Sequence, residues 1–205
     1  MALIIDGNAL AAEIRTEVSA DVARLTTSTG IVPGLNLLLV GEDPASTVYV
    51  RNKSKDCEKV GIRSTIVRMA ATATEEEVVE QVREWNNDPT VHGILVQLPI
   101  PKHIDEHRVI RTIDPAKDVD GFHPENAGRL LIGLDGFIPC TPYGVLEMLK
   151  RYNIETSGKH AVVVGRSNIV GKPLAILLAQ KRPQGNATVT ICHTGTPNIA
   201  EHTRR

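Results

Sequence analysis

Hydrophobic positions along the chain follow two spacings, one typical of helices and one of buried strands. In residues 8–25 apolar side chains recur every three or four positions, which predicts an amphipathic helix. The runs GLNLLLVG (34–41) and HGILVQLP (92–99) are short and apolar, as strands covered on both faces should be. IRSTIVRM (62–69) predicts a further strand. Helical and extended segments therefore alternate through the first half of the chain.

Residues that begin and end helices support this assignment. In the segment 43–61, Asp43 is placed as an N-cap, Pro44 occupies the first helical position and Gly61 stops the helix. In the next helix Thr74 and Glu77 have the spacing of a capping box. Repeated strand–helix units of this kind predict an α/β fold with a parallel sheet and helices on both faces.

A second series of strand–helix units follows a stretch, 114–142, that is expected to be irregular. Thr141 and Pro142 are expected to open the first helix of this series. We predict two domains, an N-terminal α/β substrate domain over 1–140 and a Rossmann-type domain over 141–205. Two clear strands are too few for an independent doubly wound sheet, so we expect that sheet to be incomplete at residue 205. The predicted elements of the second series are a helix at 143–153, a strand at 160–165, a helix at 171–181 and a strand at 186–193.

Composition narrows the classes of function. The formal net charge is −1 and no basic run occurs, which argues against nucleic-acid or anionic-membrane partners. No signal peptide and no transmembrane segment is expected. Cys57, Cys140 and Cys192 lack CxxC spacing, which argues against a disulfide framework or a zinc site. We therefore expect a cytoplasmic protein with no metal site.

The segment GRSNIVGKP, residues 165–173, lies between a predicted strand and a predicted helix. It is not a P-loop, because five residues separate Gly165 from Gly171 and Pro173 stands where serine or threonine is needed. It is not GxGxxG either, because Ser167 replaces the second glycine. Its position still allows backbone N–H groups and a helix N-terminus to face a diphosphate. A plain glycine turn is the alternative.

The end of the following strand indicates which dinucleotide is bound. A carboxylate there would bind a ribose diol, but this strand ends in Cys192, His193 and Thr194. With Arg166 nearby, the lack of an acid favours a 2′-phosphate, and hence NADP over NAD. The alternative is that Arg166 is a solvated turn residue.

Another candidate site is YVRNK, which places Tyr49 and Lys53 four residues apart on a predicted helix. At about 100° per residue, both fall on one stripe with Val50, Cys57 and Val60. An ordinary lysine at the edge of a packed helix would also fit this position. However, the helix follows the carboxyl end of a predicted strand, where ligands gather in open α/β sheets. The sequence thus leaves open whether the pair faces a cleft or simply packs.

Tyr-x-x-x-Lys also occurs in short-chain dehydrogenases, whose glycine-rich turn precedes the pair. Here the turn comes after it, which excludes that class. The chain instead resembles the bifunctional methylenetetrahydrofolate dehydrogenase/methenyltetrahydrofolate cyclohydrolase family. The motifs are similar in sequence and in order, across essentially the whole chain. The similar segments are VGEDPASTVYVRNKSKDCEKVGI, GILVQLPIP, DPAKDVDGFHPENAGRL, PCTPYGVLEML and VVVGRSNIVGKP.

The resemblance implies an NADP-dependent enzyme, usually a homodimer, that oxidises 5,10-methylenetetrahydrofolate and hydrolyses the methenyl product to 10-formyltetrahydrofolate. It implies that Lys53 is catalytic, that Tyr49 stacks on the folate, that Gln97 partners the lysine and that Asp120 anchors the pterin. It also implies that cofactor contacts come from Gly165, Arg166, Ser167 and Thr194.

Physical chemistry is compatible with these roles. A carboxylate at Asp120 could bind the adjacent N–H donors of a pterin, although DVDG also fits a plain turn. Gln97 can hydrogen-bond an amine without adding charge, although it could also be a capping amide at a strand end. Two alternatives remain for the chain as a whole. They are a non-catalytic NADP-binding or regulatory module and a monofunctional dehydrogenase of the same family.

Overall fold

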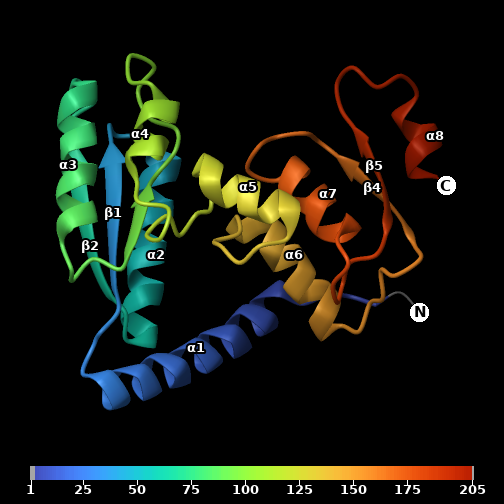
Figure 1. Ribbon diagram of the computed structural model, residues 1–205, viewed down its shortest axis with the longest axis horizontal. Helices are drawn as coiled ribbons and strands as arrows, with labels where there is room; N and C mark the ends of the chain where they lie inside the picture. The colour runs from blue at the N-terminus through green and yellow to red at the C-terminus, as the bar shows by residue number, and fades with distance from the viewer. Residues whose placement is uncertain (1–2, 205) are drawn as a thin grey trace. The chain divides into compact units, whose positions relative to one another are not determined.

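The computed structural model describes residues 3–204, which form two compact units (Figure 1). One unit comprises residues 6–119, and the other comprises residues 3–5 together with 120–204. The elements of the first unit are α1 (Gly7–Thr29), β1 (Gly34–Val40), α2 (Pro44–Val60), β2 (Arg63–Met69), α3 (Glu75–Asn87), β3 (Gly93–Val96) and α4 (Glu106–Thr112). Those of the second are α5 (Pro124–Ile132), α6 (Cys140–Arg151), β4 (His160–Val164), α7 (Gly171–Ala179), β5 (Thr188–Cys192) and α8 (Ile199–Thr203).

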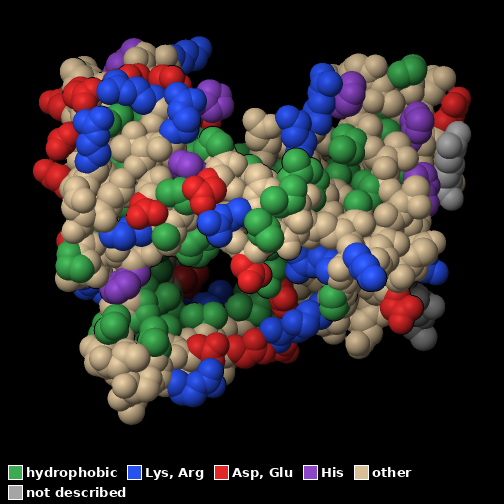
Figure 2. Space-filling model, viewed as in Figure 1, with side chains coloured by type: hydrophobic (Ala, Val, Ile, Leu, Met, Phe, Trp, Pro, Cys, Tyr) green, Lys and Arg blue, Asp and Glu red, His purple; other side chains and the backbone are tan. Residues whose placement is uncertain are grey.

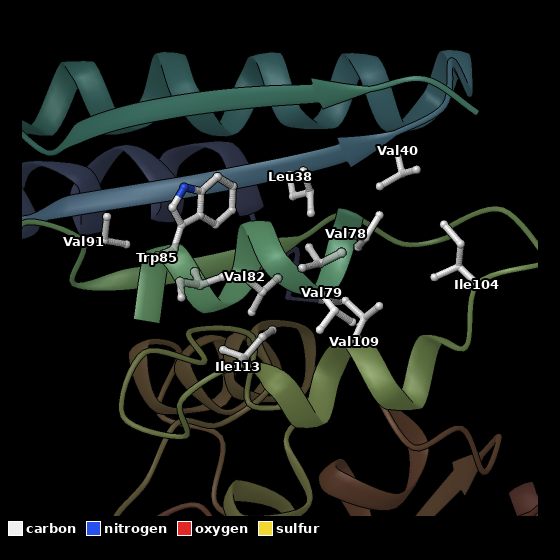
Figure 3. Close-up of a cluster of buried hydrophobic side chains, with 12 residues drawn as sticks. Leu38, Val40, Val78, Val79, Val82, Trp85, Val91, Ile104, Val109 and Ile113 are labelled. Carbon is white, nitrogen blue, oxygen red and sulfur yellow. The ribbon is translucent and has the colours of Figure 1, made fainter. Parts of the chain in front are cut away.

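The first unit is a parallel three-stranded sheet in the order β2-β1-β3, with helices on both faces. Side chains of β1 alternate between two cores. Leu37 and Leu39 pack with Val50 of α2, whereas Leu38 and Val40 point toward Val78, Val79, Val82 and Trp85 of α3 (Figure 3). The prediction of a parallel sheet covered on both faces is confirmed.

Local capping positions the two helices of this unit that cover the sheet. The Asp43 carboxylate accepts a hydrogen bond from Ser46 N at 2.8 Å, Pro44 is the first residue of α2, and Gly61 ends the helix in the left-handed conformation. Thr74 and Glu77 form the reciprocal capping box of α3. All of these predicted signals are confirmed.

The carboxyl end of α3 is closed by Lys117, a residue far away in the sequence. Its Nζ donates to the carbonyl oxygens of Trp85, Asn86 and Asp88 at 3.0, 2.8 and 2.9 Å. The backbone beside it is also bonded, since Ile94 N donates to Lys117 O at 2.7 Å. The chain leading toward Asp120 is thereby attached to both a helix end and β3.

Charged side chains of both signs cover α3 and α4 at the upper left of Figure 2. Arg108 of α4 pairs with Glu75 and, at 2.6 Å, with Glu76. Arg83 pairs with Glu76 at 3.0 Å and with Glu80 at 3.2 Å. Arg108 therefore joins α4 to the first turn of α3.

The second unit contains the parallel pair β4–β5, and its core combines α5, α6, α7 and the two strands. Two expectations need correction. The stretch 114–142 is not irregular throughout, because it contains α5, which begins at Pro124 and ends at the left-handed Gly133. Helix α6 begins at Cys140 rather than Thr141, with Pro139 as the N-cap residue.

The boundary of the two units lies between Val119 and Asp120. The domain boundary predicted after residue 140 stays a prediction. Among the helices of residues 3–204, none combines the length and the apolar character needed to cross a membrane.

Candidate functional site

Lys53 lies on α2, one turn after Tyr49. The side chain of Lys53 is half-buried, near the fully buried Val50. Tyr49 is 60% exposed, so it lies outside the buried stripe on which the sequence placed it. The stripe is centred on Ser46, Val50 and Val60, and a tyrosine at its edge points its ring toward solvent. Tyr49 is thus available for a ligand but does not stabilise the core.

The half-buried amine of Lys53 meets the side chain of Gln97. Lys53 Nζ donates to Gln97 Oε1 at 3.2 Å, across 44 residues of sequence. The other end of the amide is also bonded, because Gln97 Nε2 donates to Leu98 O at 2.7 Å. This second bond orients the amide so that its oxygen faces the lysine. The predicted partnership of these two residues is present in the structure.

Sheet topology brings the pair together. Helix α2 follows the carboxyl end of β1, and Gln97 follows the carboxyl end of the neighbouring parallel strand β3. Gln97 N donates to Leu38 O at 2.9 Å, which extends the pairing of β1 and β3 by one residue. The pair therefore lies at the carboxyl ends of the strands, where ligands bind in open α/β folds.

Asp120 belongs to the second unit and is half-buried. It lies in a turn that ends at Gly121, whose φ of +67° is left-handed. A Cβ at Gly121 would lie 2.7 Å from Phe137 O, so no larger residue fits there. The predicted turn is present, and the backbone of Asp120 is fixed by it.

The turn after β4 closely joins strand and helix. Gly165 N donates to Cys192 O at 2.7 Å, which holds the ends of β4 and β5 side by side. A Cβ at Gly171 would lie 2.6 Å from Gly165 C and 2.9 Å from Arg166 N. Glycine at 171 therefore allows α7 to start directly against the turn, a role glycines have in dinucleotide-binding folds.

The polar groups of this turn suit a phosphate-bearing ligand. Ser167 Oγ accepts hydrogen bonds from Val170 N at 3.1 Å and from Gly171 N, the first residue of α7, at 3.3 Å. Within residues 3–204, the backbone N–H groups of 166–169 donate to no protein acceptor. They are available for phosphate oxygens, and the chemistry of the turn fits a dinucleotide.

Arg166 and the residues after β5 lie next to each other. Arg166 Nη1 is 3.3 Å from His193 Nε2, and Thr194 follows as an exposed turn residue. No aspartate or glutamate occurs in 165–172 or 193–198. His193 was not among the site residues predicted from the sequence, where it showed only that no acid follows β5. Its position between Cys192, where β5 ends, and Thr194, a predicted cofactor residue, is the signal that could have identified His193 as a neighbour of Arg166.

Comparison with known proteins places these two regions in one family. Residues 5–120 match the catalytic domain of tetrahydrofolate dehydrogenase/cyclohydrolase, and residues 139–205 match the NAD(P)-binding domain of the same enzymes. The curated Bifunctional protein FolD of Chlorobium chlorochromatii is 57% identical over 205 residues, which are 99% of this chain and 70% of the relative.

Solved structures agree. A bifunctional FolD methylenetetrahydrofolate dehydrogenase/cyclohydrolase from Campylobacter jejuni superposes with a TM-score of 0.93 at 44% identity, covering 98% of this chain and 70% of that one. The Trypanosoma brucei FolD, solved with NADP cofactor and inhibitor, gives a TM-score of 0.93 at 38% identity, covering 99% of this chain and 69% of that one. The chain spans about 70% of the length of such relatives, and the protein belongs to the tetrahydrofolate dehydrogenase/cyclohydrolase family.

Proposed function

We propose that this protein oxidises 5,10-methylenetetrahydrofolate to the methenyl cation with NADP and then hydrolyses the cation to 10-formyltetrahydrofolate. Family membership supports both activities, since the matching family is that of tetrahydrofolate dehydrogenase/cyclohydrolase. The Campylobacter jejuni relative is named as a bifunctional methylenetetrahydrofolate dehydrogenase/cyclohydrolase, and the Trypanosoma brucei relative was solved with NADP. The observation that carries the proposal in this chain is the Lys53–Gln97 pair at 3.2 Å. A monofunctional dehydrogenase has no evident need for a half-buried amine held in this way.

In the first reaction the folate loses a hydride from the methylene carbon between N5 and N10. When bound, NADP supplies the nicotinamide C4 that accepts this hydride. The protein's part is to hold the folate: Tyr49 offers an exposed ring for stacking, and Asp120 offers a carboxylate for the pterin N–H groups. The turn at 165–167 and Thr194 hold the dinucleotide.

In the second reaction water adds to the methenyl carbon, and the carbon–N5 bond then breaks. The free amine of Lys53 takes a proton from the attacking water and returns one to N5 as that nitrogen leaves. The products are 10-formyltetrahydrofolate and one released proton. Gln97 holds the amine through its oxygen and adds no charge that would stabilise the ammonium form.

Replacing Lys53 with methionine tests this assignment, because methionine keeps the apolar stem and removes the amine. We expect the decay of methenyltetrahydrofolate to fall by about a hundredfold or more, in the range of lost general acid–base catalysis. Binding of NADP should stay within about twofold of the parent. The two steps are followed separately, as NADPH formation and as methenyl decay.

Lys55→Met is the matched control, since Lys55 is an exposed lysine on the same helix. It should leave both rates at the parental level. A Lys53→Met protein that still hydrolyses the methenyl cation at the parental rate would exclude the proton-transfer role. A parent that forms NADPH but never hydrolyses the cation would support a monofunctional dehydrogenase instead.

We also propose that the protein is a cytoplasmic homodimer. Within residues 3–204 no disulfide joins Cys57, Cys140 or Cys192 to another cysteine, as is common for proteins of a reducing compartment. The dimer rests on resemblance to the family. Light scattering after size-exclusion chromatography tests it, with a mass near 22.3 kDa identifying a monomer and twice that mass a dimer.

A further inference from the structure

Lys117 uses every hydrogen-bond donor of its ammonium group at the end of α3. The group has three N–H donors, and Nζ lies 3.0, 2.8 and 2.9 Å from the carbonyl oxygens of Trp85, Asn86 and Asp88. These carbonyls belong to the last turn and the C-cap of α3, where the negative end of the helix dipole lies. That last turn contains no basic residue of its own. The positive charge comes instead from a lysine 29 to 32 residues further along the chain.

The backbone around Lys117 is fixed as well. Ile94 N of β3 donates to Lys117 O at 2.7 Å, and Lys117 N donates to Asp114 O at 2.7 Å. Asp118, which is buried, forms a parallel β-bridge with Ile94. The segment is therefore attached to α3 through a side chain and to β3 through its backbone.

Val119 continues this attachment toward the helix that carries Lys53. A Cβ at Gly93 would lie 2.6 Å from Val119 Cγ1, so the valine side chain lies directly over the glycine. Val119 also packs against the buried cluster that contains Val50 of α2, three residues before Lys53. Asp120 is the next residue after Val119, so its backbone starts from a point that is fixed against both β3 and α2.

We propose that Lys117 is a positioning residue for folate binding, because it fixes the segment from which Asp120 reaches the pterin. The inference rests on the proposed function, in which Asp120 binds the pterin N–H groups, and adds a residue that acts through Asp120. Hydrogen bonds to a carboxylate depend on distance and direction, so a small displacement of Asp120 weakens them. Releasing Lys117 would allow that displacement, whereas Lys53 and Gln97 would keep their own bond.

A double-mutant cycle tests whether Lys117 acts through Asp120. Lys117→Met keeps the apolar stem and removes the three donors. Alone, it should raise the dissociation constant of tetrahydrofolate, measured by calorimetry, about fivefold or more. In an Asp120→Asn background the same substitution should raise this constant by less than about twofold, because the bonds that depend on position are already weakened there. The NADP dissociation constant should change by less than about twofold in each variant.

Lys55→Met is the matched control, since Lys55 is an exposed lysine of the same unit. It should leave tetrahydrofolate binding at the parental level in both backgrounds. Removing a charge from a helix end also lowers stability, so urea unfolding establishes the conditions under which every variant is folded and binding is compared.

The parent protein gives a second measurement that does not require Lys117→Met to fold. Binding and positioning are reciprocal, so tetrahydrofolate held by Asp120 must in turn stabilise the attached segment. Amide hydrogen exchange at 117–119 should slow by at least about threefold with saturating tetrahydrofolate, relative to the exchange of β1 in the same sample. NADP should not slow it, and the effect of tetrahydrofolate should be lost in Asp120→Asn.

The outcomes separate this inference from the proposed function. If Asp120→Asn binds tetrahydrofolate as tightly as the parent, the pterin-binding role of Asp120 is wrong and the proposed function loses that residue. If Asp120→Asn binds weakly but Lys117→Met binds like the parent, only the positioning role is wrong. An equal loss from Lys117→Met in both backgrounds also contradicts it, because Lys117 would then act independently of Asp120. Exchange at 117–119 that does not respond to tetrahydrofolate in the parent has the same consequence.

Discussion

Gln97 is bonded at both ends of its amide, and this decides what it can do for Lys53. Because Nε2 donates to Leu98 O, the oxygen is committed to the lysine and the amide cannot turn over without losing both bonds. A carboxylate in the same place would attract the ammonium form and hold the proton that the lysine has to give up. A neutral acceptor can orient the amine without doing so. The pairing of two residues 44 positions apart was suggested by family resemblance, since no local pattern relates them.

Asp120→Asn keeps the shape of the side chain and removes its charge. If Asp120 anchors the pterin through charge-assisted hydrogen bonds, each worth roughly 1.5–3 kcal/mol, folate binding should weaken by about tenfold or more. NADP affinity should change little. Calorimetry with tetrahydrofolate and with NADP measures both, and Asp135→Asn, at an exposed carboxylate of the same unit, is the control. Unaltered folate binding in Asp120→Asn would remove this residue from the site.

Helix α2, with preferred capping residues at both ends, was predicted correctly, whereas α4, α5 and α8 were not predicted. Asp43, Pro44 and Gly61 mark α2 through contacts within a few residues, which a sequence shows directly. Helix α5 is capped by His123, whose Nδ1 accepts from Glu125 N at 3.1 Å, and histidine is not among the preferred capping residues. Tyr49 is a different error: the helical spacing was right, but the centre of the buried stripe lies on Val50, one position away. That centre depends on how α2 packs against β1, which is tertiary information.

The join between β4 and α7 depends on Gly171. Alanine there would place a Cβ 2.6 Å from Gly165 C, so the helix would have to move away from the turn. We expect Gly171→Ala to lower the free energy of unfolding by about 2 kcal/mol or more. Gly144→Ala in α6 is the control, because its Cβ would meet nothing within 4 Å. It should raise that free energy by about 0.5–1 kcal/mol, since alanine favours helix. Urea unfolding compares the two, and equal stabilities would contradict the close join.

The contact between α3 and α4 should make stability depend on pH. Hydrogen bonds from Arg108 hold the pKa of Glu75 and of Glu76 below the usual value of 4.5. A carboxyl whose pKa is depressed by folding stabilises the protein above its unfolded pKa, and this contribution is lost as the pH falls through the folded pKa. Arg108→Met should therefore lower the melting temperature at pH 7, and the difference from the parent should shrink toward zero below about pH 4.5.

Added salt should reduce the same difference, because all three side chains are partly exposed. Arg24→Met is the control, since Arg24 forms an exposed pair with Asp21 inside one helix. Its effect on melting should be small at every pH. A deficit in Arg108→Met that stays constant from pH 7 to pH 3 would show that the ion pairs are not responsible.

The two units differ in how well their sheets are covered. In the first, β1 is bonded on both sides, and Leu37, Leu38 and Leu39 are wholly buried. In the second, β4 and β5 form a pair within the described residues, and Val164 and Ile191 are 60% and 42% exposed. Local opening is governed by such differences in burial and in paired backbone.

Amide hydrogen exchange should reflect this difference. We expect the amides of β1 to exchange at least about tenfold more slowly than those of β4 and β5, because β1 opens only with its whole sheet. Mass spectrometry of peptides covering 34–40, 160–164 and 188–192 measures the three strands in one experiment. Equal exchange in all three would mean that the chain opens as one cooperative unit.

Lys117, whose ammonium closes the end of α3, has a consequence for chemical labelling. Its nitrogen is engaged by three carbonyl oxygens, whereas the amine of Lys55 extends from an exposed side chain of α2. Acylation requires an accessible amine nitrogen that can attack the reagent. Lys117 should therefore be protected while Lys55 is modified. After acylation the nitrogen keeps a single N–H group, so Lys117 could no longer donate to all three carbonyl oxygens. Lys117 is thus a built-in footprinting probe for the corner where α3 ends, and its labelling would report that this corner has opened.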